Sequence, residues 1–255
     1  MKLDCILTAC NLNPLYCDFI PLFIKTWNKL YPNVDVKIVL ISETIPENLK
    51  IYESNIILFK PILDVSTAFI SQYIRLLYPA ILNYTNGIMI TDIDMLPMNN
   101  TYYTKPIESY DNNKFIYLRD VLINSDRQIA MCYNVATSKT WQDIFNIHSL
   151  EDINTSLMNR FKSIDFVEGT SKICWFTDQI ELYNHVLLWN KKTNNFVYLH
   201  DKNTGYSRLD RIHMNTHTLD ESMKTKIKNG VFSDYHCLRP YSKYKVLNEM
   251  IYDAL

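Results

Sequence analysis

The sequence predicts an α/β protein with a mostly parallel central sheet flanked by helices. Through the first 100 residues, short apolar and β-branched segments alternate with amphipathic segments of helical period, which is the pattern of strands joined by crossover helices. The chain has 255 residues, of which 47% are hydrophobic and 13% aromatic, so it can bury one large core and is too apolar to be disordered. No linker rich in Pro, Gly or Ser interrupts it, and we expect a single domain over residues 1–255.

Four strands are expected in the first half, where apolar β-branched residues are bounded by turn residues: 4–10, 35–41, 55–59 and 87–93. One helix should follow the turn at 11–14 and run to about Leu30. A second should begin with Ser66 as its N-cap and run to Leu82, because apolar residues recur there at i+4 spacing. The order is strand, helix, strand, strand, helix, strand.

The second half has less regular patterns. Three further strands are predicted, at 114–118, 128–135 and 194–199. Helices are predicted at 139–147, 150–161 and 178–189. The tail from Asp220 is polar until Val231, and no element is assigned to it.

Charge and glycine content exclude several classes of function. The chain has 26 basic and 27 acidic side chains, a net charge of -1, so it lacks the basic footprint of a nucleic-acid-binding protein. It has 4 glycines where average usage would give roughly 18. Neither Gly-rich phosphate-binding motif, GxGxxG or GxxxxGK[ST], occurs in it.

The cysteines and the apolar segments predict where the protein resides. The six cysteines have neither CxxC spacing nor the spacing of a disulfide framework, which indicates a reducing compartment. No transmembrane segment is expected, because no run of 18 apolar residues occurs and Asp4 interrupts the apolar N-terminus. We therefore expect a cytoplasmic protein.

Two acidic residues follow the strand predicted at 87–93. Asp92 and Asp94 flank Ile93, and in an extended backbone residues two apart point to the same side. Open α/β sheets bind ligands beyond the carboxyl ends of their strands. Two carboxylates there suit Mg²⁺ or Mn²⁺ that also binds diphosphate oxygens. The alternative is a pair of solvated turn residues.

His236 and Arg239 lie in a late segment with few apolar neighbours. As a third ligand beside two carboxylates, His236 would favour Mn²⁺ over Mg²⁺, because imidazole nitrogen is a softer donor. Arg239 could add positive charge beside a diphosphate. The alternative for His236 is a surface residue or a hydrogen-bonded core residue.

Asp178, Gln179 and Arg75 each allow two interpretations. The pair 178–179 stands where a helix should begin, and spacing alone favours Thr177 or Asp178 as an N-cap over a role beside a substrate. Arg75 lies on the helix that precedes the acidic pair. Its stem could simply cover apolar surface, or its guanidinium could pair with Asp92 or with a substrate hydroxyl.

Residues 66–82 and 87–96 together resemble the helix, strand and DxD motif of nucleotide-sugar glycosyltransferases of the GT-A fold. The nearest likeness is to small glycosyltransferases of giant and algal DNA viruses, and a more distant one is to glycogenin and the family 8 enzymes. The specific feature is an Arg-bearing helix that ends in Leu-Leu-Tyr-Pro before Thr-Asp-Ile-Asp-Met-Leu-Pro. The resemblance implies a nucleotide-sugar-binding half at about 1–100 and an acceptor-binding half at about 101–255. If the source is viral, the location is the host cytoplasm or the virion.

The resemblance also implies roles for individual residues. The end of the first strand contacts the nucleotide base, and the matching residues are Thr8, Ala9, Cys10 and Asn11. The motif Asp92-Ile93-Asp94 binds the donor, and Asp92, Asp94 and His236 hold Mn²⁺ or Mg²⁺. Arg75 touches the donor sugar and the first aspartate, and Asp178-Gln179 lies beside the sugar. The resemblance therefore favours a role beside the substrate for Asp178 over a role as N-cap.

The sequence departs from the family 8 pattern at two places. Ile90-Thr91 stands where an aromatic residue and leucine usually precede the acidic pair, and the usual lysine after the late histidine is replaced by Arg239 or Lys243. These two departures weaken any assignment of the sugar donor from the resemblance.

The resemblance implies a metal-dependent glycosyltransferase that moves a sugar from a nucleoside-diphosphate donor to a glycan or protein acceptor. A UDP-sugar is the favoured donor, and a reaction that retains the anomeric configuration is favoured. Alternatives are an inverting enzyme with Asp178 as base, or a non-catalytic nucleotide- or glycan-binding protein on the same fold. A nucleotidyltransferase is disfavoured, because it would need a Gly-rich loop and the turn at 8–14 has no glycine.

Overall fold

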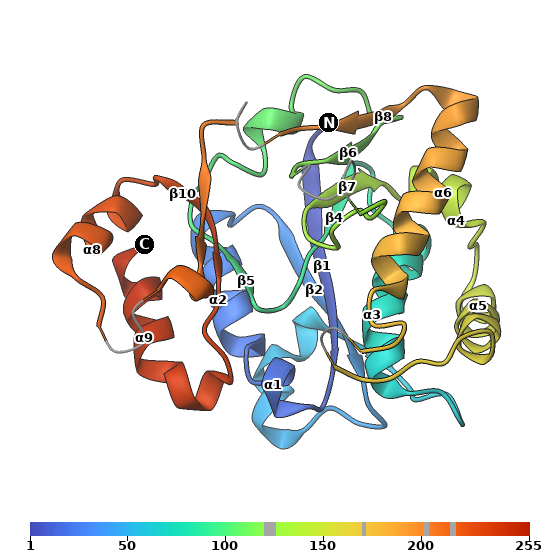
Figure 1. Cartoon of the computed structure of the whole chain (residues 1–255), viewed down its shortest axis with the longest axis horizontal. Coiled ribbons are helices and arrows are strands. Elements are labelled where there is room, and N and C mark those ends of the chain that lie inside the picture. Colours follow the sequence, from blue (N-terminus) through green and yellow to red (C-terminus); the bar gives the residue numbers. More distant parts are fainter. Residues whose placement is uncertain (120–125, 170–171, 201–203, 215–217) are drawn as a thin grey trace.

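The computed structural model describes residues 1–255 except 120–125, 170–171, 201–203 and 215–217. A central sheet stands between two layers of helices, and a smaller sheet with its own helices packs at one side (Figure 1). This mixed α/β architecture with a mostly parallel central sheet is the predicted fold class. Among the described residues, no helix has both the length and the apolar character needed to cross a bilayer.

The described residues form a seven-stranded central sheet in the order β3-β2-β1-β4-β7-β6-β8. Neighbouring strands run parallel except at β7, which is antiparallel to β4 and to β6. The strands are β1 (Leu3–Asn11), β2 (Asp35–Ile41), β3 (Ile56–Phe59), β4 (Gly87–Ile90), β6 (Phe115–Tyr117), β7 (Asn134–Thr137) and β8 (Phe196–Tyr198). The carboxyl ends of β1 and β4 therefore lie at the same edge.

Two apolar cores form on opposite faces of this sheet. Alternate residues of β1 separate to the two faces: Cys5 and Leu7 pack into one core, and Ile6 and Cys10 into the other. The first core includes α3 (Thr67–Leu77), α4 (Ser138–Phe145), α5 (Leu150–Lys162) and α6 (Thr177–Thr193). The second includes α2 (Ile20–Leu30), which follows the short α1 (Pro14–Cys17).

The smaller sheet has the order β5-β10-β9, and its middle strand is antiparallel to β5 and parallel to β9. Its strands are β5 (Met95–Pro97), β9 (Ser207–Asp210) and β10 (Phe232–His236), and α8 (Glu221–Lys228) and α9 (Tyr241–Ala254) lie beside it (Figure 1). His236 pairs with Met95 in this sheet, and Cys237 N donates to Asp94 O at 2.9 Å. A late segment is thereby held against the end of the acidic motif.

The described residues also form short 3₁₀ helices. They are η1 (Glu47–Asn55), η2 (Tyr78–Ile81), η3 (Lys105–Ile107) and η4 (Arg211–His213). Ser66 occupies the N-cap of α3 as predicted, but its side chain makes no capping hydrogen bond. The predicted helix to Leu82 is α3 followed by η2, where Pro79 interrupts the α-helical hydrogen bonding.

Two predicted strands have different bounds in the structure. The strand expected at 87–93 ends at Ile90, and a turn follows in which Met95 N donates to Asp92 O at 3.2 Å. Asp92 and Asp94 therefore lie in a turn, and the extended geometry expected for them is wrong. The strand expected at 128–135 is β7, which begins only at Asn134.

Candidate active site

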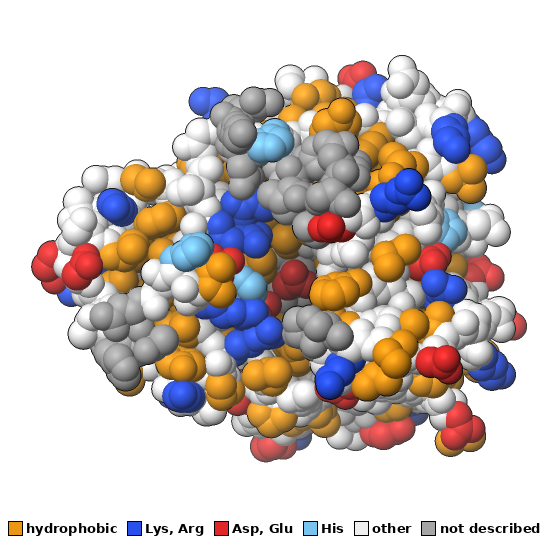
Figure 2. Space-filling model, in the orientation of Figure 1, with side chains coloured by type: hydrophobic (Ala, Val, Ile, Leu, Met, Phe, Trp, Pro, Cys, Tyr) orange, Lys and Arg blue, Asp and Glu red, His pale blue; other side chains and the backbone are white. Residues whose placement is uncertain are grey.

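A pocket opens where the carboxyl ends of β1 and β4 meet the start of α6 and the smaller sheet. Its cavity measures about 260 Å³. Figure 2 shows the hollow near the middle of this face, with acidic atoms inside it and basic side chains and a histidine along the edge nearest the smaller sheet. The predicted residues that line it are Ala9, Cys10, Asn11, Arg75, Asp92, Ile93, Asp94, Asp178, Gln179, His236 and Arg239.

Thr8 and Lys243 stand apart from that set. Thr8 is fully buried on β1 and is not among the pocket-lining residues. Lys243 lies on α9 with its ammonium 5.0 Å from the ring of Tyr244, and it does not line the pocket either. Of the two candidates for the cation after the late histidine, Arg239 is the one that faces the cavity.

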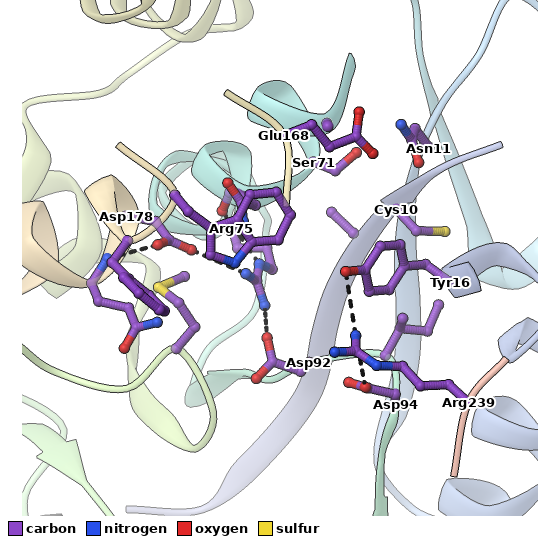
Figure 3. A pocket seen from close by; sticks show the side chains of 18 of the residues that line it. Cys10, Asn11, Tyr16, Ser71, Arg75, Asp92, Asp94, Glu168, Asp178 and Arg239 are labelled. Atoms are coloured by element: carbon purple, nitrogen blue, oxygen red, sulfur yellow. Dashed lines mark hydrogen bonds and ion pairs between the residues drawn. The ribbon is translucent and has the colours of Figure 1, made fainter. Parts of the chain in front are cut away.

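Arg75 joins the acidic motif to the start of α6 (Figure 3). Its Nη1 donates to Asp92 Oδ1 and, at 3.2 Å, to the backbone oxygen of Thr91. Its Nη2 lies 3.2 Å from Asp178 Oδ2. The Arg75 side chain is 8% exposed, so this guanidinium connects two carboxylates inside the protein, and it does not merely cover apolar surface.

Asp178 is the buried acid on one side of the pocket. Burial raises its pKa to about 7, although Arg75 acts in the opposite direction. The capping interpretation is wrong: the N-cap position of α6 is Phe176, and Asp178 Oδ1 accepts its hydrogen bond from the adjacent Gln179 N at 2.8 Å. A buried carboxyl that titrates near neutrality is typical of functional sites.

Asp94 faces the other side of the pocket. Its Oδ2 lies 2.9 Å from Arg211 Nη1, 3.4 Å from Arg239 Nη1 and 3.6 Å from His236 Nε2. Burial alone would raise the pKa of Asp94, but His236 and the two arginines outweigh it and hold that pKa well below the ordinary range. The His236 ring is held at its other nitrogen, since Nδ1 lies 3.2 Å from Asp210 Oδ2.

The side chains of this pocket are of the chemical types that bind the expected metal ion. Two carboxylates and an imidazole suit Mn²⁺, and a carboxylate on the far nitrogen of a histidine is the usual support for a metal-ligating ring. As the side chains stand, the described part of the chain gathers no three His, Cys, Asp or Glu groups around one point. Asp94 and His236 are adjacent, whereas Asp92 is turned toward Arg75. Metal binding stays a prediction.

Several residues that line or support the pocket were not anticipated from the sequence, and four of them make the contacts described next. Arg211 follows β9 and reaches Asp94, and Asp210 supports His236. Tyr16 on α1 accepts a hydrogen bond from Arg239 Nη1 at 3.3 Å. Glu168 lines the pocket mouth and accepts from Asn13 Nδ2 at 3.2 Å. No spacing in the sequence indicates these contacts, because each joins residues that are distant in the chain.

Comparison with solved structures identifies enzymes of similar shape. A galactosyltransferase, LgtC, solved in complex with donor and acceptor sugar analogues, aligns with a TM-score of 0.53 and 14% identity over 98% of this chain and 96% of LgtC. GlyE, a glycosyltransferase of Streptococcus pneumoniae TIGR4, aligns with a TM-score of 0.52 and 13% identity over 100% of this chain and 60% of GlyE. No protein-family model matches the sequence, and no curated protein matches it significantly.

At such low identity these likenesses carry information on architecture. The alignment with LgtC covers nearly the whole of both chains, including the central sheet and the smaller sheet beside it. The chain therefore has the GT-A fold.

Proposed function

We propose that this protein is a metal-dependent glycosyltransferase that moves a sugar from a nucleoside-diphosphate donor to a glycan or protein acceptor. The favoured donor is a UDP-sugar. The observation that carries the proposal is the division of charge in one pocket. Arg75 holds Asp92 and Asp178 on one side, and Arg211, Arg239 and His236 surround Asp94 on the other. The reaction needs both kinds of surroundings, one for the sugar and one for the diphosphate.

The Asp94 side suits the leaving diphosphate. Breaking a glycosyl–diphosphate bond places negative charge on the diphosphate oxygens, and preorganised cations stabilise that charge. Arg211 and Arg239 both line the cavity, and their Nη1 atoms lie 2.9 Å and 3.4 Å from Asp94 Oδ2. A divalent ion held by Asp92, Asp94 and His236 would supply Lewis-acid stabilisation of the same charge.

The Asp178 side suits the sugar. As the bond breaks, positive charge develops on the sugar ring, and a nearby carboxylate and amide stabilise it. Asp178 and Gln179 both line the cavity, and Asp178 is held by Arg75 at 3.2 Å. In a retaining reaction the two side chains would support departure and attack on the same face of the sugar, which is the outcome we favour.

One observation favours an inverting reaction as the second candidate. A general base works best when its pKa lies near the operating pH, and burial raises the pKa of Asp178 to about 7. In that case Asp178 would accept the proton of the acceptor hydroxyl. The anomeric configuration of the first product, followed by NMR, separates the two: configuration kept from the donor supports retention, and a changed one supports Asp178 as the base.

The donor is tested by ligand screening. Thermal unfolding is measured with UDP-, GDP- and dTDP-sugars, each with Mn²⁺ and with a chelator, because a ligand that binds only the folded state raises the melting temperature. We expect stabilisation by a UDP-sugar that needs the metal, followed by metal-dependent donor turnover. Binding without any turnover would point to a non-catalytic binding protein on this fold, and absence of stabilisation by every donor would contradict the proposal.

The acidic motif is tested by substitution. Asp94→Asn should keep the melting profile of a folded protein and lose donor turnover by at least about 100-fold, a loss typical for a group that positions transition-state charge. Asp143→Asn is the matched control, because Asp143 lies on α4 away from the pocket with its side chain 46% exposed. Full turnover in Asp94→Asn would refute the assignment.

A further inference from the structure

A single carboxylate oxygen in the pocket is approached by two guanidinium groups and an imidazole. Asp94 Oδ2 lies 2.9 Å from Arg211 Nη1, 3.4 Å from Arg239 Nη1 and 3.6 Å from His236 Nε2. The Asp94 side chain is 7% exposed and that of Arg211 is 20% exposed. Arg211 makes the shortest of these contacts, and neither composition nor motif spacing pointed to it.

The smaller sheet determines where Arg211 points. Arg211 begins η4 directly after β9, and β9 pairs in parallel with β10 so that Asp210 lies opposite His236. The guanidinium is held at a second point, because Nη1 also donates to the backbone oxygen of Cys237 at 3.1 Å. The residue after His236 is thus bonded both to Arg211 and, through its N–H, to Asp94 O.

Arg211 and a divalent cation would compete for this carboxylate. An ion bound at Asp94 would place its charge within a few ångströms of the Arg211 and Arg239 guanidinium groups, and like charges at that range repel strongly where water is scarce. The arginines and the ion become compatible once an anion with several oxygens lies between them. A diphosphate is such an anion, since guanidinium groups bind its oxygens well.

We propose that Arg211 is a diphosphate-binding residue that occupies Asp94 until nucleotide and metal arrive together. In the absence of a diphosphate, Arg211 neutralises Asp94 and keeps its affinity for a metal ion low. When a nucleoside diphosphate binds, Arg211 exchanges Asp94 for a phosphate oxygen and releases the carboxylate to the ion. The inference rests on the proposed function and adds that diphosphate and metal strengthen each other's binding through this arginine.

The test measures two affinities in Arg211→Gln. Mn²⁺ binding without nucleotide is followed by the EPR signal of free Mn²⁺, and UDP binding at saturating Mn²⁺ by calorimetry. Loss of the competing guanidinium should tighten Mn²⁺ binding in the absence of UDP by about threefold or more, since it removes one like charge. Loss of a charged hydrogen bond to phosphate should weaken UDP binding by about tenfold or more. The two affinities move in opposite directions.

Two further variants make the result specific. Arg211→Lys keeps the positive charge and should leave Mn²⁺ binding weak while UDP binding falls less than in Arg211→Gln. If Arg211→Gln fails to fold, the fall in UDP affinity of Arg211→Lys is the test that remains, and an unchanged UDP affinity overturns the inference. Arg160→Gln is the matched control, because Arg160 pairs with Glu181 at 2.6 Å, is 32% exposed and does not line the pocket. It should change neither affinity.

The outcomes separate the inference from the proposed function. If the unaltered protein binds none of UDP, GDP and dTDP with Mn²⁺, the proposed function is wrong and the role of Arg211 is wrong with it; if it binds GDP or dTDP instead of UDP, that nucleotide replaces UDP in the test. If the unaltered protein binds UDP and Mn²⁺ cooperatively but Arg211→Gln weakens both affinities, or changes neither, the proposed function stands and the exchange at Arg211 is overturned. The exchange at Arg211 is supported if Mn²⁺ binding tightens and UDP binding weakens in Arg211→Gln while neither affinity changes in Arg160→Gln.

Discussion

Replacement of Asp178 by asparagine should stabilise the protein increasingly as the pH rises. Burial raises the pKa of Asp178 to about 7 from an ordinary 3.8. Below about pH 4 the carboxyl is protonated in both the folded and the unfolded chain and has no effect on stability. Between pH 4 and 7 the unfolded chain loses the proton while the folded protein keeps it, so the free energy of unfolding falls through this window. Asparagine resembles the protonated carboxyl and should remove that fall.

The magnitude follows from the same pKa. Each pKa unit between folded and unfolded states corresponds to about 1.4 kcal/mol, so the full effect is on the order of 4 kcal/mol at pH 8 or above. About 2–3 kcal/mol of it should develop between pH 5 and pH 8. Asparagine also removes one partner of Arg75, which lies 3.2 Å from Asp178. The pH-dependent part of that contact is already contained in the pKa of Asp178, which Arg75 lowers, so only a pH-independent cost remains to be added.

The assay is urea-induced unfolding of the unaltered protein and of Asp178→Asn at pH 5 and pH 8. The difference in unfolding free energy between the two proteins should shift by about 2–3 kcal/mol in favour of the variant at the higher pH. Asp143→Asn, at an exposed position on α4, serves as the control and should give the same difference at both pH values. A pH-independent difference for Asp178→Asn, or a shift in favour of the unaltered protein, would refute the reasoning.

Three further predictions concern turnover and packing. If ionised Asp178 supports the sugar, donor turnover should rise with pH to a plateau, with a midpoint near its pKa of about 7, and a flat profile from pH 5.5 to 8 would contradict this. Arg75→Lys should stay folded by circular dichroism but lose at least about tenfold in turnover, because an ammonium lacks the planar fork that reaches both Asp92 and Asp178; turnover like that of the unaltered protein would be the contrary result. Gly87→Ala should lower the free energy of unfolding by about 1–3 kcal/mol, since the new Cβ would lie 2.7 Å from Val135 Cγ2 in the centre of the sheet, and a urea midpoint unchanged within error would count against it.

Local patterns in the sequence were sufficient to locate most elements of the central sheet and its helices, although β4 and β7 have bounds other than those predicted. β2 has the predicted bounds, and β1, α3 and α6 differ by a few residues at their ends. These elements combine a clear apolar period with turn residues at their ends, and both signals are carried by neighbours in the chain. Arg75 could be placed beside the acidic motif for the same reason, because its helix directly precedes β4.

The smaller sheet could not be predicted, and with it the contacts that Arg211 and Asp210 make in the candidate site. The β10 segment Phe-Ser-Asp-Tyr-His contains a polar residue at three of five positions and shows no apolar alternation. Its strand character comes from pairing with β5, more than 130 residues earlier in the chain, and with β9. Arg211 and Asp210 depend on that pairing, so their contacts with Asp94 and His236 follow from long-range register and leave no mark on local spacing.

The turn after β4 explains why two acids of one motif have different surroundings. Ile93, between them, is 3% exposed and packs into the core that includes α2. With that side chain anchored, Asp92 extends toward Arg75 and Asp178, and Asp94 extends toward Arg211, Arg239 and His236. In an extended strand both carboxylates would have pointed to the same side of the backbone. Because the turn separates them, the Asp92 side retains a buried carboxyl with a raised pKa, while the Asp94 side collects the cations that a diphosphate requires.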